Sequence, residues 1–271
     1  MAGRKKDTVS CFDAQFTMDF PRATSPQLAK NAAHMSAQLI TAARDLRDAV
    51  RQLVFSKPVT HVYNPLDYAW AAHRKYLRKF GAGRKRVIFL GLNPGPFGMV
   101  QTGVPFGEVA AVRDWLGITA RIGRPPREHP KKLVAGFACH RSEVSGRRLW
   151  GFFAARFARP EEFFADHFVV NYCPLAFFDE GGRNLTPDKL PVAPAGKLFH
   201  ACDAHLRRVV EMLEPEWLVG VGDFAARRAG MIFPDAAPRI GKILHPSPAS
   251  PAANRGWAAA AERQLRALGA W

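Results

Sequence analysis

The sequence has few of the features that define several common protein classes. Its four cysteines, Cys11, Cys139, Cys173 and Cys202, lie far apart and form no CxxC pair. This spacing argues against a disulfide framework and against a local zinc motif. A cysteine cluster would have to be assembled by folding. No run approaches the ~18 apolar residues that a membrane-spanning helix needs, and the opening MAGRKKDTVS has no apolar segment typical of a signal peptide. We therefore expect a soluble intracellular protein with reduced thiols and no membrane partner.

Acidic residues are scarce relative to basic ones. The chain has 39 Lys and Arg against 23 Asp and Glu, a formal net charge of +16. Such an excess favours a polyanionic partner, through counterion release and electrostatic steering. Nucleic acid is the first candidate and an anionic membrane the second. The Ala- and Arg-rich composition points to a bacterial source and a location at the nucleoid in the cytoplasm, whereas a eukaryotic protein would be nuclear.

Several catalytic motifs are absent from the sequence. We find no GxSxG, HExxH or P-loop, so serine hydrolase, metalloprotease and ATPase functions have no support. The stretch Gly220 to Ala225 matches the dinucleotide fingerprint G-x-G-x-x-A, but it follows the third predicted strand and has no acidic residue about twenty positions later. The turn that contains Gly222 could offer backbone N–H groups to a phosphate. The alternative is a tight turn with no ligand. We expect no cofactor and no metal.

Four β-rich runs predict the fold. They begin at Val87, Phe168, Trp217 and Arg239, are nearly continuous in apolar residues, and are separated by helical stretches. This pattern is typical of parallel strands buried on both faces. We predict an α/β protein: a three-layer α/β/α sandwich around a small, about four-stranded, mostly parallel sheet.

The chain reads as a loose N-terminal arm over residues 1–27 followed by one domain over 28–271. Apolar residues at steps of three and four predict a helix over 36–55, ended by Pro58. Further helices are predicted at 108–118, 146–158 and around Leu206. A last helix follows Ser250 as N-cap and ends near Gly269.

Polar residues follow the predicted strands at their carboxyl ends, where open α/β sheets bind ligands. Asn93 lies in a loop rich in glycine and proline, which lets backbone approach a ligand, although it could simply satisfy a turn. Asn171 can read the edge of a base or bond neighbouring backbone. His245 precedes a Pro-Ser-Pro turn that holds it in place, so a functional role is favoured over a structural one.

Two stretches carry a family resemblance: GLNPGPFGMVQTGVPFGEV from Gly91 and HPSPASPAANRGW from His245. They strongly resemble the two active-site motifs of the single-strand-selective monofunctional uracil-DNA glycosylases. The segments YNPLDYAW, REHPKK with SEVSGRRLWGFF, and VVNYCPLAFFDEGGRNLTPDKLP also resemble that family, so the likeness runs from about residue 63 to 257.

The resemblance implies the uracil-DNA glycosylase sandwich and hydrolysis of the bond between uracil and deoxyribose, without a lyase step. It implies that Asn93 positions the attacking water and that His245 hydrogen-bonds O2 of the departing base. It further implies that Phe106 stacks on the flipped ring and that Asn171 pairs with N3 and O4. The remaining implied pocket residues, near C5 of the base, are Gly95 and Met99.

The resemblance also implies contacts with DNA. The segment PSPASPAAN is expected to enter the gap left by the flipped base, with DNA contacts from Gly222, Ser247, Pro248, Ala249 and Arg255. Where relatives can carry a large basic residue this chain has Ala249, so the efficiency on duplex DNA is open. The expected partner is DNA with uracil or a modified uracil such as 5-hydroxymethyluracil, bound by a monomer acting in base-excision repair.

Four alternatives remain on the sequence alone. A mismatch-type uracil/thymine glycosylase is disfavoured by the histidine of HPSP, and an iron–sulfur uracil glycosylase by the scattered cysteines. A non-catalytic DNA-binding module would bind DNA with a steep salt dependence and release no base. A nucleotide-binding Rossmann-like protein would be stabilised by NAD or flavin.

Overall fold

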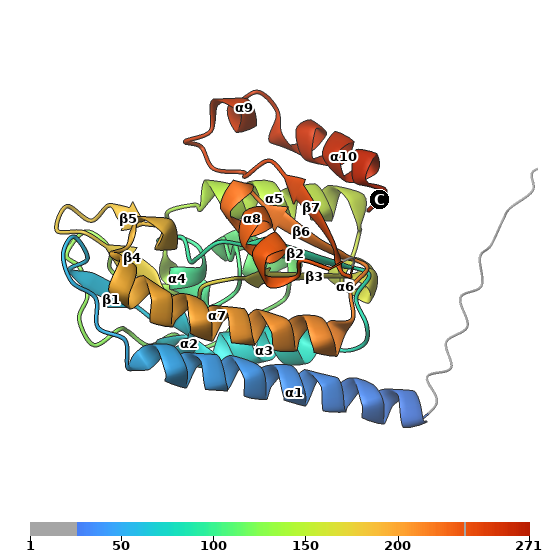
Figure 1. Cartoon of the computed structure of the whole chain (residues 1–271), viewed down its shortest axis with the longest axis horizontal. Helices are drawn as coiled ribbons and strands as arrows, with labels where there is room; N and C mark the ends of the chain where they lie inside the picture. Colours follow the sequence, from blue (N-terminus) through green and yellow to red (C-terminus); the bar gives the residue numbers. More distant parts are fainter. Residues whose placement is uncertain (1–25, 236) are drawn as a thin grey trace, which may run out of the picture.

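The computed structural model describes residues 26–235 and 237–271, and a four-stranded parallel sheet lies at its centre (Figure 1). The strands are β2 (Val87–Gly91), β3 (His167–Asn171), β6 (Trp217–Val221) and β7 (Arg239–Ile243), in the order β3-β2-β6-β7. They coincide with the four predicted runs. Strands β2 and β6 are buried along their whole length, as expected for central strands covered on both faces.

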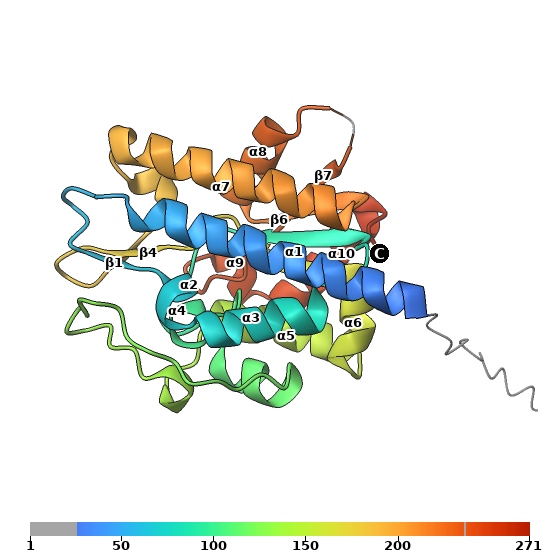
Figure 2. The ribbon, with the colours of Figure 1, turned by 90° about the horizontal axis from the view of Figure 1, so that it is seen from below.

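Helices cover both faces of this sheet and make the three predicted layers. Figures 1 and 2 show α1 (Pro26–Arg51), α3 (Trp70–Phe80) and α7 (Val192–Leu213) side by side on one face. On the other face lie α5 (Val144–Arg156) and α10 (Trp257–Leu268), while α8 (Asp223–Ile232) packs against β6 and β7. None of the helices in the described residues is long and apolar enough to cross a membrane.

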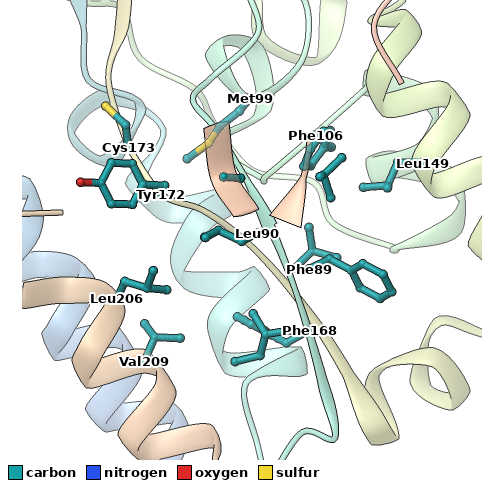
Figure 3. Close-up of a cluster of buried hydrophobic side chains, with 14 of the residues drawn as sticks. Phe89, Leu90, Met99, Phe106, Leu149, Phe168, Tyr172, Cys173, Leu206 and Val209 are labelled. Carbon is teal, nitrogen blue, oxygen red and sulfur yellow. The ribbon is translucent and has the colours of Figure 1, made fainter. Parts of the chain in front are cut away.

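Alternating side chains of β2 join the two halves of the core. Phe89 packs against Phe153 of α5, with ring centroids 5.0 Å apart. In Figure 3, Leu90 lies on the side of the sheet where α7 contributes Leu206 and Val209. The period-two alternation of a strand thus fixes which helix layer each side chain meets. This rigid core carries the loop that follows β2.

A second, smaller sheet was not predicted. It is antiparallel, in the order β1 (His61–Tyr63), β4 (Ala176–Phe178), β5 (Asn184–Leu185). Strands this short give too little alternation to be recognised in the sequence. The other short elements are α2 (Pro65–Tyr68), α4 (Met99–Thr102), α6 (Pro160–Asp166), α9 (Pro251–Asn254), a π-helical turn at Ala111–Trp115 and 3₁₀ turns at Gly136–Ala138 and Pro187–Lys189.

Four predicted helices have different bounds in the structure, among them α5, predicted at 146–158 and found at Val144–Arg156. Helix α1 starts at Pro26 and ends at Arg51; further along, the backbone N–H of Thr60 donates to the carbonyl oxygen of Phe178 just before β1. Within the predicted helix 108–118, the π-helical turn covers only Ala111–Trp115 and is followed by Gly117 at φ 63°. The predicted last helix is divided into two helices, α9 and α10, which are separated by Gly256 at φ 115°. Residues 1–25 of the predicted arm lie outside the described residues.

Candidate active site

A pocket opens at the carboxyl edge of the parallel sheet, where the sequence predicted a ligand site. Its cavity volume is about 280 Å³. Its walls come from the loops after β2 and β7, from the carboxyl end of β3, from the start of α5 and from the β5 region. The lining residues are Leu92, Asn93, Gly95, Pro96, Met99, Phe106, Glu143, Ser145, Asn171, Asn184, Thr186, His245, Ser247 and Pro248.

Asn93 is oriented by a backbone carbonyl on the neighbouring loop. Its Nδ2 donates a hydrogen bond of 3.2 Å to the carbonyl oxygen of Leu175. The thiol of Cys173 in turn lies 3.7 Å from that carbonyl oxygen and accepts from the Leu175 N–H at 3.4 Å. With its amide nitrogen engaged, Asn93 has its side-chain oxygen left to accept a hydrogen bond from a water molecule.

The turn after β7 fixes the tautomer of His245. Its Nδ1 accepts a hydrogen bond of 3.1 Å from the backbone N–H of Ser247. Burial lowers the pKa of His245 to about 4, so the ring is neutral near pH 7. A neutral imidazole that accepts at Nδ1 carries its proton at Nε2. His245 therefore lines the pocket as a neutral hydrogen-bond donor.

Phe106 and Asn171 approach each other over Gly91, the last residue of β2. A Cβ at Gly91 would lie 2.5 Å from Cε2 of Phe106 and closer still to Oδ1 of Asn171. Phe106 holds a left-handed backbone, φ 51°, which is unusual for an aromatic residue and points to a functional constraint. Nδ2 of Asn171 lies 3.2 Å from the sulfur of Met99. An aromatic face and an amide edge thus meet in one pocket.

The sequence analysis missed four polar lining residues: Glu143, Ser145, Asn184 and Thr186. Glu143 lies against Gly95, where a Cβ would be 2.5 Å from its Oε2, and it accepts a hydrogen bond of 3.2 Å from the N–H of Phe97. Burial is the main cause that raises its pKa. None of the four follows a strand of the parallel sheet, so the strand-end argument could not select them.

The predicted DNA-contacting residues divide into two groups. Ser247 and Pro248 line the pocket, whereas Ala249 and Arg255 are exposed outside it. Gly222 lies behind His245, because a Cβ there would be 3.0 Å from the Cβ of the histidine. Its backbone N–H donates to the carbonyl oxygen of Ile243, so that group is not free for a phosphate.

Helix α5 holds the segment that contains Ser247 to Ala249. The guanidinium of Arg148 donates to the carbonyl oxygen of Pro246 at 3.0 Å and to Oδ1 of Asn254 at 2.9 Å. Nδ2 of Asn254 donates to the carbonyl oxygen of Pro248 at 2.9 Å. The segment after β7 is therefore tied at both ends to the rim of the pocket.

The glycine-rich turn after β6 and the cysteines, which could have indicated a cofactor or a metal, have other surroundings in the structure. Gly220 allows α8 to pack on β6, since a Cβ there would overlap the backbone of Ala226. The described residues hold no group of three or more His, Cys, Asp or Glu placed to bind a metal ion. Their cysteines, Cys139, Cys173 and Cys202, are free thiols, and Cys11 lies outside the described residues. That the chain needs no cofactor stays a prediction.

Comparison with curated proteins relates this pocket to a known family. The family model of the uracil DNA glycosylase superfamily matches residues 78–266. The single-strand selective monofunctional uracil-DNA glycosylases of Bos taurus, Rattus norvegicus and Mus musculus are each 50% identical to the chain over 226 residues. Those matches cover 83% of this chain and 81–83% of the relatives. These relatives are mammalian, so the expected bacterial source stays a prediction.

A solved structure supports the fold. The crystal structure of wild-type Pedobacter heparinus SMUG2 matches with a TM-score of 0.58 at 15% identity, covering 84% of this chain and 97% of that one. At this identity the likeness concerns the fold alone. The family model and the curated relatives show that the chain belongs to the uracil DNA glycosylase superfamily and, within it, to the family of the single-strand-selective monofunctional uracil-DNA glycosylases.

Proposed function

We propose that this chain hydrolyses the N-glycosidic bond of uracil in DNA and leaves an abasic site. The observation that carries the proposal is the meeting of Asn93, Phe106, Asn171 and His245 in one pocket at the carboxyl edge of the sheet. The names of the family relatives describe the same monofunctional activity. The reaction would be the first step of base-excision repair, wherever in the cell the DNA is kept.

The pocket chemistry suits departure of the base as an anion. Cleavage through an oxocarbenium-like sugar leaves negative charge on uracil, so a donor whose hydrogen bond strengthens as that charge develops lowers the barrier. We assign this role to the neutral Nε2–H of His245, toward O2 of the base. A neutral donor suits this role because uracil is uncharged when it binds. The pocket then holds no fixed charge against a neutral base.

Asn93 would orient the water that attacks the sugar. An amide is a weak base, but an oxocarbenium ion reacts with a correctly positioned neutral water. The hydrogen bond from Nδ2 of Asn93 to Leu175 fixes which amide atom faces that water. None of the pocket-lining residues is a lysine. We therefore propose hydrolysis without a lyase step.

Base selection is assigned to Phe106 and Asn171. The ring of Phe106 would stack on the flipped base, and the amide of Asn171 would pair with N3–H and O4 of uracil. Cytosine would leave polar groups unpaired, at a cost of about 1–3 kcal/mol for each buried group. Gly95 and Met99 would line the space around C5, which extends the proposed substrates to 5-hydroxymethyluracil.

Strand preference follows from how the base reaches the pocket. Flipping costs least in single strands and mismatches. Ala249 is exposed at the tip of the segment that would fill the gap, and its methyl group is a small wedge. We propose activity on both single-stranded and duplex DNA, lower on duplex, by a metal-free monomer.

The test is alkaline cleavage of a labelled oligonucleotide with one uracil, as a single strand and in U·G and U·A duplexes. We expect uracil release by the wild type and a fall of about 10²–10³-fold in His245→Ala, the range found when a key hydrogen-bond donor is removed. Asn93→Ala should lose at least about 10²-fold, because the attacking water is no longer positioned. Binding of DNA without release would reject the glycosylase and leave the DNA-binding module. Release of thymine from T·G pairs at the same rate would favour the mismatch-type enzyme.

A further inference from the structure

Two cations stack on one aromatic ring beside the pocket. Nζ of Lys132 lies 5.0 Å from the centroid of the Phe97 ring, and Cζ of Arg141 lies 3.9 Å from the same centroid. Both distances are within the range of a cation–π contact. Phe97 belongs to the loop that carries Asn93, Gly95 and Pro96 into the pocket, whereas the two cations come from the segment between α4 and α5.

These two positive charges lack an ion-pair partner in the part of the chain that the structure describes. Within the described residues, neither Lys132 nor Arg141 makes a side-chain hydrogen bond or an ion pair, although 16 ion pairs form elsewhere in these residues, for example between Arg208 and Asp45 at 2.7 Å. The carboxylate of Glu143 is a partial counter-charge, since it opposes the lowering of the Lys132 pKa, but it is largely buried and already accepts a hydrogen bond from the N–H of Phe97.

The pair is costly in the unbound protein. Burial, and next the positive charge of Arg141, lower the pKa of Lys132. Like charges held together without a partner destabilise the folded state, unless an anion binds between them. The ring of Phe97 keeps both side chains in place and so reduces the conformational entropy that an incoming anion would have to overcome.

The residues around Lys132 and Arg141 indicate which anion would bind to them. Glu143 lies close to Arg141 in the chain and accepts a hydrogen bond from Phe97, and Pro96 directly precedes Phe97. Both line the same pocket as Ser247 and Pro248. A nucleotide whose base occupies this pocket has its phosphates at the pocket rim. Arg141 precedes the pocket-lining Glu143 closely in the chain and is exposed, and Lys132 is partly exposed. A planar guanidinium beside an ammonium group suits one phosphate, the first as a fork and the second as a point charge.

We propose that Lys132 and Arg141, held on Phe97, form a clamp for a DNA backbone phosphate next to the flipped nucleotide. This phosphate clamp rests on the proposed function, because it assumes that a nucleotide enters the pocket. It would grip the strand independently of the segment after β7. It therefore supplies binding energy in a chain whose Ala249 offers no large side chain to fill the gap.

The first test is DNA binding as a function of salt. Anisotropy would follow a labelled single strand that carries one tetrahydrofuran abasic analogue, with wild type, Lys132→Gln, Arg141→Gln and the double variant. We expect the slope of log K against log salt to become shallower by about 0.7 in the double variant, the value for one single-strand phosphate. Arg84→Gln is the control, because Arg84 is exposed and precedes β2, at the opposite end of that strand from the pocket.

The second test places the phosphate. Single methylphosphonate linkages, which are neutral, would be introduced one at a time on either side of the analogue. At one linkage beside the analogue, the double variant and the wild type should bind equally, because the contact is already lost. An unchanged salt slope in the double variant, or equal sensitivity at every linkage, would overturn the clamp.

The catalytic rate separates this proposal from the proposed function. At saturating uracil-containing DNA, single-turnover release by the double variant should match the wild type, while half-saturation requires more DNA. A wild type that releases no uracil would reject the glycosylase, whatever the salt slopes. A double variant with a normal salt slope and a slower single turnover would instead make the pair a structural support of the Asn93 loop.

Discussion

Gly91 is the residue at which strand β2 passes into the loop of Asn93, and it is paired in register with Asn171. A Cβ there would overlap both Oδ1 of Asn171 and the ring of Phe106. Neither neighbour can move freely, since Asn171 belongs to β3 and Phe106 has a left-handed backbone. A glycine is thus required by close approach rather than by its own backbone angle.

We predict that Gly91→Ala lowers the free energy of unfolding by about 1–3 kcal/mol, the usual cost of overpacking, and uracil release by more than tenfold. The control is Gly151→Ala in α5, where a Cβ meets no atom within 4 Å. That substitution should stabilise the helix by about 0.5–1 kcal/mol. Urea unfolding and the uracil cleavage assay measure both effects; an active, fully stable Gly91→Ala would contradict the packing argument.

His245 gives a second prediction at the residue scale. Because burial lowers its pKa to about 4, its Cε1 resonance should stay at the neutral position from pH 8 down to about 5.5. In concentrated urea the same resonance should titrate near the ordinary value of about 6.5. NMR of labelled histidines, assigned with His245→Ala, measures this. A midpoint near 6.5 in the folded protein would mean that His245, the proposed hydrogen-bond donor, is partly an imidazolium ion near neutral pH.

At the scale of elements, α5 positions the segment that we propose enters the DNA. It does so through Arg148, whose two hydrogen bonds reach Pro246 and Asn254 on either side of Ser247 to Ala249. The sequence places an arginine pair in this helix, but only the fold shows which of the two faces the segment. Arg147 is exposed, and no side-chain hydrogen bond is found for it within the described residues.

We predict that Arg148→Met, which removes both hydrogen bonds, reduces uracil release from a U·A duplex by about tenfold, or roughly 1.4 kcal/mol. Single-stranded DNA should be affected less, because it needs no support for the gap. Arg147→Met is the matched control and should leave both rates unchanged. The measurement is the ratio of duplex to single-strand release; an equal loss on both substrates would assign Arg148 to general stability.

At the scale of the whole molecule, buried histidines couple stability to pH. Burial lowers the pKa values of His73, His167, His205 and His245 to about 4. Between the ordinary value of about 6.5 and about 4, the unfolded chain therefore binds more protons at these sites than the folded chain. Stability must fall as the pH is lowered through this window. The raised pKa of Glu143 opposes the effect by at most one proton.

We expect each of these histidines to cost on the order of 1–2 kcal/mol between pH 7 and pH 5. Urea unfolding at pH 7.5, 6.0 and 5.0 measures the sum. His167→Gln, which removes one such site, should reduce the slope of stability against pH by up to one proton. A free energy of unfolding that is constant from pH 7.5 to 5.0 would show that these rings are not held neutral.

Much of this architecture is predictable from local patterns. Continuous apolar runs with helices between them indicated the parallel sheet, and polar residues directly after β2, β3 and β7 indicated Asn93, Asn171 and His245 as site residues. Such patterns are local consequences of burying a strand on both faces and of the ligand crevice at strand ends. The antiparallel sheet was not predictable, because its strands are only two or three residues long.

The sequence by itself determined the sheet, the strand-end side chains, the positive charge and the family, since each depends on residue identity and spacing along the chain. Only the tertiary structure decided what meets across the pocket. Glu143 came to line the pocket, Gly222 came to lie behind His245, and Lys132 and Arg141 came together on Phe97. The physical reason is that contacts between segments distant in the chain depend on how the layers pack. The periodicity of apolar residues within one segment carries no information about that packing.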